Sequence, residues 1–109
     1  MKIAFKRDCG NVTLSLIGEL DHHAAKGVIP EISGIISSEL PQKLELNFEH
    51  ITFMDSSGIA VVISAYKHTI ALKCEFAVVN VPKQAYKVFK AAGICNLINI
   101  SEKNIFTNV

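Results

Sequence analysis

The chain has 109 residues, and half of them are hydrophobic, which suits one small domain spanning residues 1–109. Eleven Lys and Arg residues nearly balance ten Asp and Glu residues, so the formal net charge is +1. The basic surface that nucleic acid requires is missing, and we expect no direct contact with nucleic acid. No apolar run approaches the roughly 20 residues that span a bilayer, so we expect no membrane contact.

The N-terminal half is expected to contain a β-hairpin followed by a helix. Apolar and polar residues alternate over residues 2–17, with turn-forming residues in the middle, and Gly18 ends the second strand. Asp21 is a good N-cap for a helix that starts near His22. Pro30 lies within the apolar pattern of this helix, so we expect a kink or a second helix start at that residue.

The C-terminal half alternates between strands and helices. Apolar patterns predict further elements in the order strand 44–48, helix 56–72, strand 76–79, helix 82–92 and strand 97–100, with Ser101 opening a final helix. This order implies parallel strand pairing through right-handed crossovers, next to one antiparallel hairpin. The predicted fold class is therefore α/β, with a mixed sheet of four to five strands.

The segment Asp55-Ser56-Ser57-Gly58 lies where a loop becomes a helix. Asp55 or Ser56 can cap this helix by accepting hydrogen bonds from first-turn amides. The same helix end favours an anion, and Gly58 leaves the amides open to it, so a phosphorylated Ser56 would be tolerated. From these four residues, a simple cap and a phosphorylation site are both open interpretations.

Two motifs resemble those of the anti-sigma factor antagonists, which are stand-alone STAS domains. They are Gly18-Glu19-Leu20-Asp21-His22-His23 and Phe53-Met54-Asp55-Ser56-Ser57-Gly58, and the sporulation type is the most similar. The resemblance runs from the first strand to about Ile100. It implies a STAS fold with helices packed mainly on one side of the sheet. Pro30 and the short tail 104–109 depart from the family pattern.

The resemblance also implies a function and a site. Unphosphorylated, the chain would bind a protein that is both a serine kinase and an anti-sigma factor, and so release a sigma factor. That kinase would inactivate the chain by phosphorylating Ser56, and a separate phosphatase would restore it. The alternative is a STAS module of a general stress-response or other signalling assembly. The expected partner-binding residues are Glu19, Asp21, Asp55, Ser56, Ser57, Gly58 and Ala60.

Several roles of these residues stay open. Asp21 is as well explained by helix capping as by contact with a partner. Asp55 is as well explained by capping as by orienting the Ser56 hydroxyl for phosphorylation, and both roles can hold together. Ser57 is the competing phosphate acceptor, but it lies inside the first helical turn, where its hydroxyl can bond locally. For the helix after Ser56, the spacing predicts a buried stripe of Ile59, Val62, Ile63, Tyr66 and Ile70 and an outward face of Ser57, Ala60, Ser64 and Lys67.

We expect a cytoplasmic protein that is not an enzyme and that holds no metal or cofactor. The chain lacks a Gly-x-Ser-x-Gly elbow around Ser56 and a Gly-rich phosphate loop, which argues against a serine hydrolase and against a kinase. The four histidines lack the spacing of a metal-ligand set and are expected to be solvated. The three cysteines are widely spaced and odd in number, as is typical of free thiols in a reducing compartment.

Overall fold

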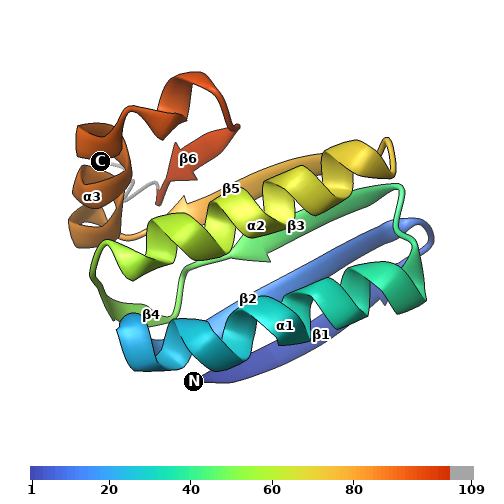
Figure 1. Ribbon diagram of the computed structural model, residues 1–109, viewed down its shortest axis with the longest axis horizontal. Coiled ribbons are helices and arrows are strands. Elements are labelled where there is room, and N and C mark those ends of the chain that lie inside the picture. The colour runs from blue at the N-terminus through green and yellow to red at the C-terminus, as the bar shows by residue number, and fades with distance from the viewer. Residues whose placement is uncertain (104–109) are drawn as a thin grey trace, which may run out of the picture.

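Strands and helices alternate along the chain in the computed structural model, which describes residues 1–103 (Figure 1). Within these residues the strands are β1 (Lys2–Asp8), β2 (Asn11–Leu20), β3 (Lys43–Asn47), β4 (Ile51–Met54), β5 (Glu75–Val81) and β6 (Ile100–Glu102). The helices are α1 (His22–Glu39), α2 (Ser57–Ala71) and α3 (Lys83–Ala92), followed by a 3-10 turn, η1 (Ile94–Asn96). The predicted α/β class and the N-terminal hairpin are confirmed.

The six strands form one mixed sheet in the order β1-β2-β3-β5-β6, with β4 beside β2. Only β1 and β2 pair in antiparallel fashion, and the other pairs are parallel. β4 is the strand that the sequence analysis missed. The ten-residue β2 is long enough to pair with two strands in turn: residues 11–15 pair with β3, and residues 18–20 pair with β4.

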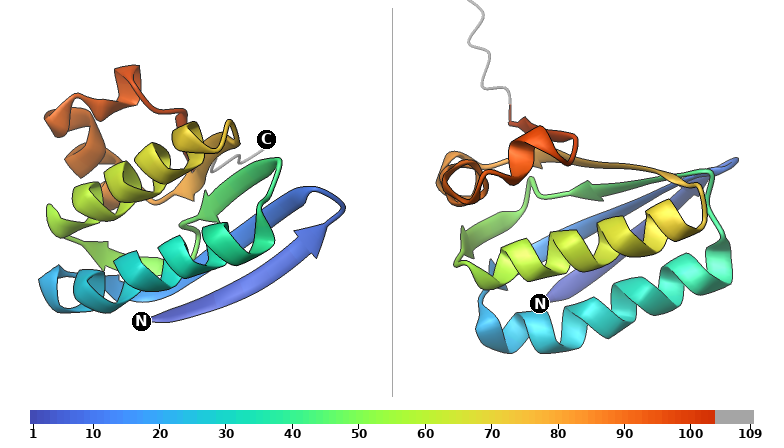
Figure 2. Two further views of the ribbon diagram at one scale, coloured as in Figure 1. Left: turned by 45° about the vertical axis from the view of Figure 1, so that its right-hand side comes forward. Right: turned by 45° about the horizontal axis from the view of Figure 1, so that its top comes forward.

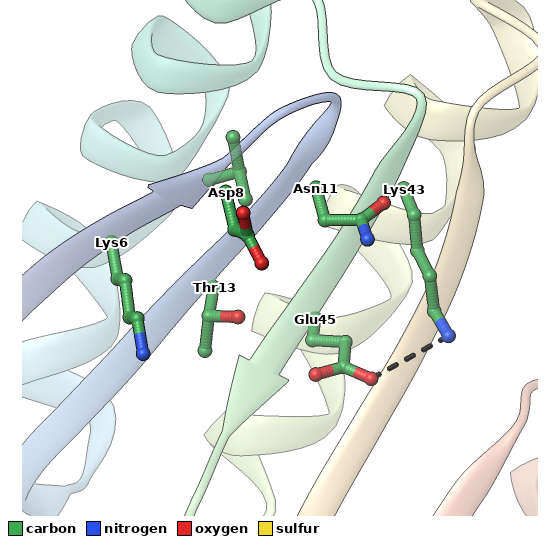
Figure 3. A pocket seen from close by; sticks show the side chains of 7 residues that line it. Lys6, Asp8, Asn11, Thr13, Lys43 and Glu45 are labelled. Atoms are coloured by element: carbon green, nitrogen blue, oxygen red, sulfur yellow. Dashed lines mark ion pairs between the residues drawn. The ribbon is translucent and has the colours of Figure 1, made fainter.

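The helices α1 and α2 lie side by side over one face of the sheet (Figures 1 and 2). Alternate residues of the central strands point into this layer, and Leu14, Leu16, Leu44 and Leu46 are fully buried there. The other face of the sheet carries polar side chains of β1, β2 and β3 (Figure 3). On that face Lys43 Nζ lies 3.5 Å from Glu45 Oε2. The core therefore lies between the sheet and its helices, as expected for helices packed mainly on one side.

α1 is a single helix through Pro30, so the expected second start at that residue is wrong. Pro30 is exposed and has no amide hydrogen to donate to the carbonyl of Lys26. Lys26 is also exposed, so water can bond to that carbonyl instead. Val28 and Ile32 on either side are buried against the core, and this packing holds the helix together.

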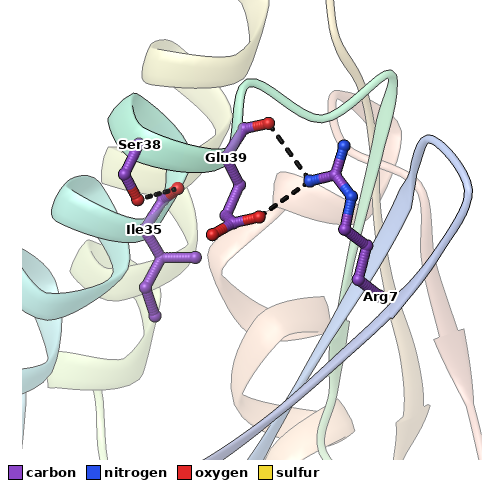
Figure 4. A network of polar contacts seen from close by, with 4 residues as sticks. All are labelled: Arg7, Ile35, Ser38 and Glu39. Carbon is purple, nitrogen blue, oxygen red and sulfur yellow. Dashed lines mark hydrogen bonds and ion pairs between the residues drawn. The ribbon is translucent and has the colours of Figure 1, made fainter.

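The C-terminal end of α1 is fixed to the edge strand β1. The Arg7 guanidinium donates to the Glu39 carboxylate at 2.8 Å and to the Glu39 carbonyl at 3.2 Å (Figure 4). Both side chains are partly solvent-exposed, so the ion pair contributes at most about 1 kcal/mol to stability.

The C-terminal elements differ from the prediction. The last strand comes slightly later than expected, at β6, where it pairs with β5. Ser101 lies in this strand and does not open a helix, because its neighbours complete the edge of the sheet. The rest of the predicted final helix, residues 104–109, lies outside the described residues.

The buried face of α2 is rotated relative to the predicted stripe. The buried residues of α2 are mostly small: Gly58, Val61, Val62, Ala65 and Thr69. Ile70 is 53% exposed, and the predicted core residues Ile59, Ile63 and Tyr66 are only half-buried. Small residues let α2 approach the sheet closely, while the larger side chains pack on its flanks, where the Tyr66 ring lies 6.2 Å from that of Phe76.

Within residues 1–103, no helix has the length and apolar character needed to cross a membrane.

Candidate functional site

The two sequence motifs meet at the carboxyl ends of β2 and β4. Glu19 is paired with Phe53 and Leu20 with Met54 across the two parallel strands. The backbone amide of Asp55 donates to the Leu20 carbonyl at 3.3 Å, which joins the loop that follows β4 to the end of β2. Both motifs therefore lie at one edge of the sheet. The strand before the Ser56 loop, however, is β4, whereas β3 was expected.

Asp21 caps α1 in the predicted way. Its Oδ1 accepts a hydrogen bond from the amide of Ala24 at 2.9 Å, and its backbone is extended, as an N-cap requires. The side chain is half-buried, whereas that of Glu19 is exposed. One carboxylate is therefore engaged by the fold, and the other is free to meet solvent or a partner.

At the start of α2, Asp55 makes the capping bond and Ser56 does not. The Asp55 Oδ1 accepts from the amide of Ser57 at 2.8 Å, while the Asp55 carbonyl accepts from Gly58 at 3.1 Å. Ser56 occupies the N-cap position with helical dihedral angles (φ −64°, ψ −15°), and its side chain makes no capping bond. Of the two predicted caps, Asp55 is the correct one. The exposed hydroxyl of Ser56 is left out of the cap.

Gly58 is required for packing. It is buried, and a Cβ at this position would lie 2.5 Å from Met54 Cγ, closer still to its Sδ, and 3.2 Å from Leu20 Cδ2. We expected Gly58 to leave the helix amides open to an anion. That role is wrong, because a side chain at this position would point toward Met54 and Leu20. The glycine instead allows the first turn of α2 to lie against the ends of β2 and β4.

Gln84, in the first turn of α3, is a part of this site that sequence reasoning missed. Its side-chain Nε2 donates to the Met54 carbonyl at 2.8 Å, and its Oε1 accepts from the Met54 amide at 2.9 Å. The amide side chain thus occupies the free edge of β4 as a further strand would. The contact spans 30 residues of sequence, and no local pattern indicates it.

The remaining predicted residues lie around Ser56 with different exposure. Ala60 is exposed one helical turn after Ser56, as predicted, and Ser57 is half-buried. Phe53, which was not predicted as a site residue, is 45% exposed on β4. An exposed hydroxyl, an exposed aromatic ring and the Glu19 carboxylate therefore share this edge of the molecule.

The four histidines do not gather around Ser56. His22, His23 and His50 are exposed, as expected. His68 differs, because its Nδ1 lies 3.1 Å from the Ser33 hydroxyl and connects α2 to α1. Within the described part of the chain, no three His, Cys, Asp or Glu side chains are placed to hold a metal ion.

Three curated relatives are similar over most of the chain. An anti-sigma F factor antagonist of Lysinibacillus sphaericus is 32% identical over 83 residues, which cover 76% of this chain and 71% of the relative. One of Paenibacillus polymyxa is 26% identical over 105 residues, covering 96% of this chain and 90% of the relative. An anti-sigma-B factor antagonist of Listeria monocytogenes is 23% identical over 100 residues, covering 92% and 85%.

Solved structures of the anti-sigma factor antagonist SpoIIAA have the same fold. The unphosphorylated form superposes with a TM-score of 0.77 and the phosphorylated form, from Bacillus, with 0.69, each at 28% identity. Both alignments cover 91% of this chain, and they cover 87% and 90% of the respective SpoIIAA chains. The sequence profile of the STAS domain matches residues 2–109, and the chain therefore belongs to the STAS domain family.

Proposed function

We propose that this chain is an anti-sigma factor antagonist that works by partner switching, with Ser56 as its phosphorylation site. The observation that carries this proposal is the helix start at Ser56. Its hydroxyl is exposed and makes no capping bond, because Asp55 caps the helix in its place. The names of the relatives agree with this function, and SpoIIAA has been described in an unphosphorylated and a phosphorylated form.

In this proposal the unphosphorylated chain binds an anti-sigma factor and displaces the sigma factor. The contact surface is the edge at Ser56, with Glu19, Asp21, Asp55 and the α2 residues Ser57, Gly58 and Ala60. Gly58 contributes through its backbone, since it is buried. The anti-sigma factor also acts as a serine kinase, a separate phosphatase removes the phosphate, and the cycle takes place in the cytoplasm.

The phosphate would act through its charge and its size. It adds about −1.5 to −2 charges next to the Asp55 carboxylate, at a position where a partner would exclude water. A difference in binding free energy of about 3 kcal/mol between the two forms changes affinity roughly a hundredfold. One phosphate left unpaired in an interface is sufficient for a difference of this size.

The test is the intact mass after incubation with ATP, Mg²⁺ and the cognate kinase, for the wild type, Ser56→Ala and Ser57→Ala. The proposal predicts one phosphate on the wild type and on Ser57→Ala, and none on Ser56→Ala. A phosphate that persists in Ser56→Ala and disappears in Ser57→Ala would assign the phosphorylation site to Ser57. If the wild type binds the kinase and takes no phosphate, the chain is a binding module that is not switched by phosphorylation.

The similarity to an anti-sigma-B factor antagonist supports one second candidate, a role in the general stress response. A pull-down with the tagged chain separates the two. Recovery of a small kinase with a sporulation sigma factor would support the sporulation role. Recovery of a stress-response sigma factor, or of large scaffold proteins, would support the alternative.

A further inference from the structure

An open groove lies between α2 and α3 and begins at Ser56. It has a volume of about 600 Å³. Its lining consists of the N-cap residue Ser56, Ile59 of α2, and Gln84, Lys87, Val88, Ala91 and Ala92 of α3. Ile59 and Val88 are half-buried, and the two alanines are exposed. The floor of the groove is therefore apolar, while a hydroxyl and an ammonium group stand among its lining groups.

Lys87, which lines the groove, belongs to a row of lysines along α3. Lys83, Lys87 and Lys90 are spaced four and three residues apart, so they share one side of the helix, and all three are exposed. α3 contains no Asp or Glu, and within residues 1–103 none of the three lysines forms an ion pair. In a chain with a formal net charge of only +1, this is a local concentration of positive charge.

We infer that this α2–α3 groove binds an acidic segment of the anti-sigma factor that inserts apolar side chains between the two helices. The inference rests on the proposed function, because the groove continues the surface around Ser56. Apolar side chains fit the floor formed by Ile59 and Val88, and carboxylates flanking them would meet the lysines of α3. A basic or neutral segment would leave those ammonium groups without partners at a surface from which water is excluded.

The groove also gives the phosphate on Ser56 a physical mode of action. Ser56 belongs to the lining, so its phosphate would stand in the groove and place about −1.5 to −2 charges there. That charge repels the carboxylates of the bound segment and attracts the ammonium group of Lys87 that they would use. The same modification therefore occupies the Ser56 end of the groove and opposes the binding of an acidic partner.

Binding of the purified cognate anti-sigma factor, measured by calorimetry, tests this inference with two groove variants and one matched control. Lys87→Glu reverses the charge beside the groove, and Ala91→Glu puts a carboxylate into it. Each variant sets like charges against the acidic segment and is expected to weaken binding about tenfold or more. Lys6→Glu makes the same charge change on the opposite face of the sheet and is expected to bind as the wild type does. Thermal melts of all three variants check that the exposed substitutions leave the fold intact.

The footprint of the complex in an amide NMR spectrum gives a second readout. Shifts are expected at residues 87–92 as well as at 55–60. If the wild type binds but the footprint omits α3 and both groove variants bind normally, the groove inference is overturned and the proposed function stands. If the wild type does not bind the anti-sigma factor, both fail.

Two other occupants would also overturn the inference. A second copy of the chain in the groove would appear as a dimer in sedimentation that Ala91→Glu converts to a monomer. The chain's own residues 104–109 would be identified as the occupant if a variant ending at Lys103 binds the anti-sigma factor more tightly than the full chain.

Discussion

Two hydrogen bonds join the Gln84 side chain of α3 to the backbone of Met54 in β4. We therefore predict that this one side chain contributes measurably to the free energy of unfolding. In Gln84→Ala, the Met54 amide and carbonyl both lose their partner. Each hydrogen bond contributes about 0.5–1.5 kcal/mol, which gives about 1–3 kcal/mol for two. Gln84 is partly exposed, so water replaces some of this, and we expect a loss of about 1–2 kcal/mol.

The matched variant Gln84→Glu keeps the shape of the side chain and changes only its ability to donate. A carboxylate still accepts from the Met54 amide, but it places a second acceptor against the Met54 carbonyl. The protonated acid restores the donor, so folding raises the pKa of this carboxyl above the unfolded value of about 4.3. The added stability is therefore present in full below about pH 4 and is lost as the pH rises through the folded-state pKa.

Urea denaturation followed by circular dichroism, at pH 7 and near pH 4, measures these effects. Relative to the wild type at the same pH, Gln84→Glu should lose more stability at pH 7 than near pH 4, and Gln84→Ala should lose the same amount at both. Lys90→Ala, on the exposed side of the same helix, serves as the control and should change stability by less than about 0.5 kcal/mol. If both Gln84 variants match that control at pH 7, Gln84 does not hold β4.

Three further predictions concern the helix start and the thiols. Gly58→Ala should destabilise the domain by about 1–2 kcal/mol in urea denaturation, since overpacking against Met54 outweighs the gain in helix propensity; an unchanged midpoint would contradict the close packing. Asp55→Ala should cost about 1 kcal/mol by the same assay and Ser56→Ala less than about 0.5, and the reverse order would assign the cap to the serine. Burial raises the pKa of the Cys74 thiol, so a thiol reagent should modify exposed Cys9 well before Cys74, as peptide mass mapping would show; equal rates would contradict the burial.

Local patterns were sufficient to predict most of the fold. Apolar and polar residues alternate along β1 and β2, which indicates a sheet with one covered face. The alternation around Leu44 and Leu46 of β3, which are buried, indicates the same. The Asp21 cap depends on an amide only three residues away, so the sequence contains it in full. The site's two motifs were also found, because each contains polar residues where a strand or loop meets a helix.

The features that were missed depend on contacts between distant residues. β4 has only four residues, with the exposed Thr52 and Phe53 in its middle, and it becomes a strand because β2 extends past β3. Gln84 reaches β4 from another helix. Which side of α2 is buried depends on how closely Gly58 lets that helix approach the sheet. The periodicity of the sequence contains no information on this distance.

The contacts of Asp55, Gln84 and Gly58 separate the fold from the proposed switch. The bonds of Asp55 cap α2, Gln84 closes the edge of β4, and Gly58 fixes the spacing between helix and sheet. None of the three bonds or contacts uses the Ser56 hydroxyl, so a phosphate added there breaks no bond that these residues make. The charge of the phosphate then changes the affinity for the partner, while the stability of the domain stays nearly constant. If Ser56 supplied the cap, its phosphate would replace the hydroxyl at the first-turn amides, and each cycle of modification would change the stability of the helix as well as the affinity for the partner.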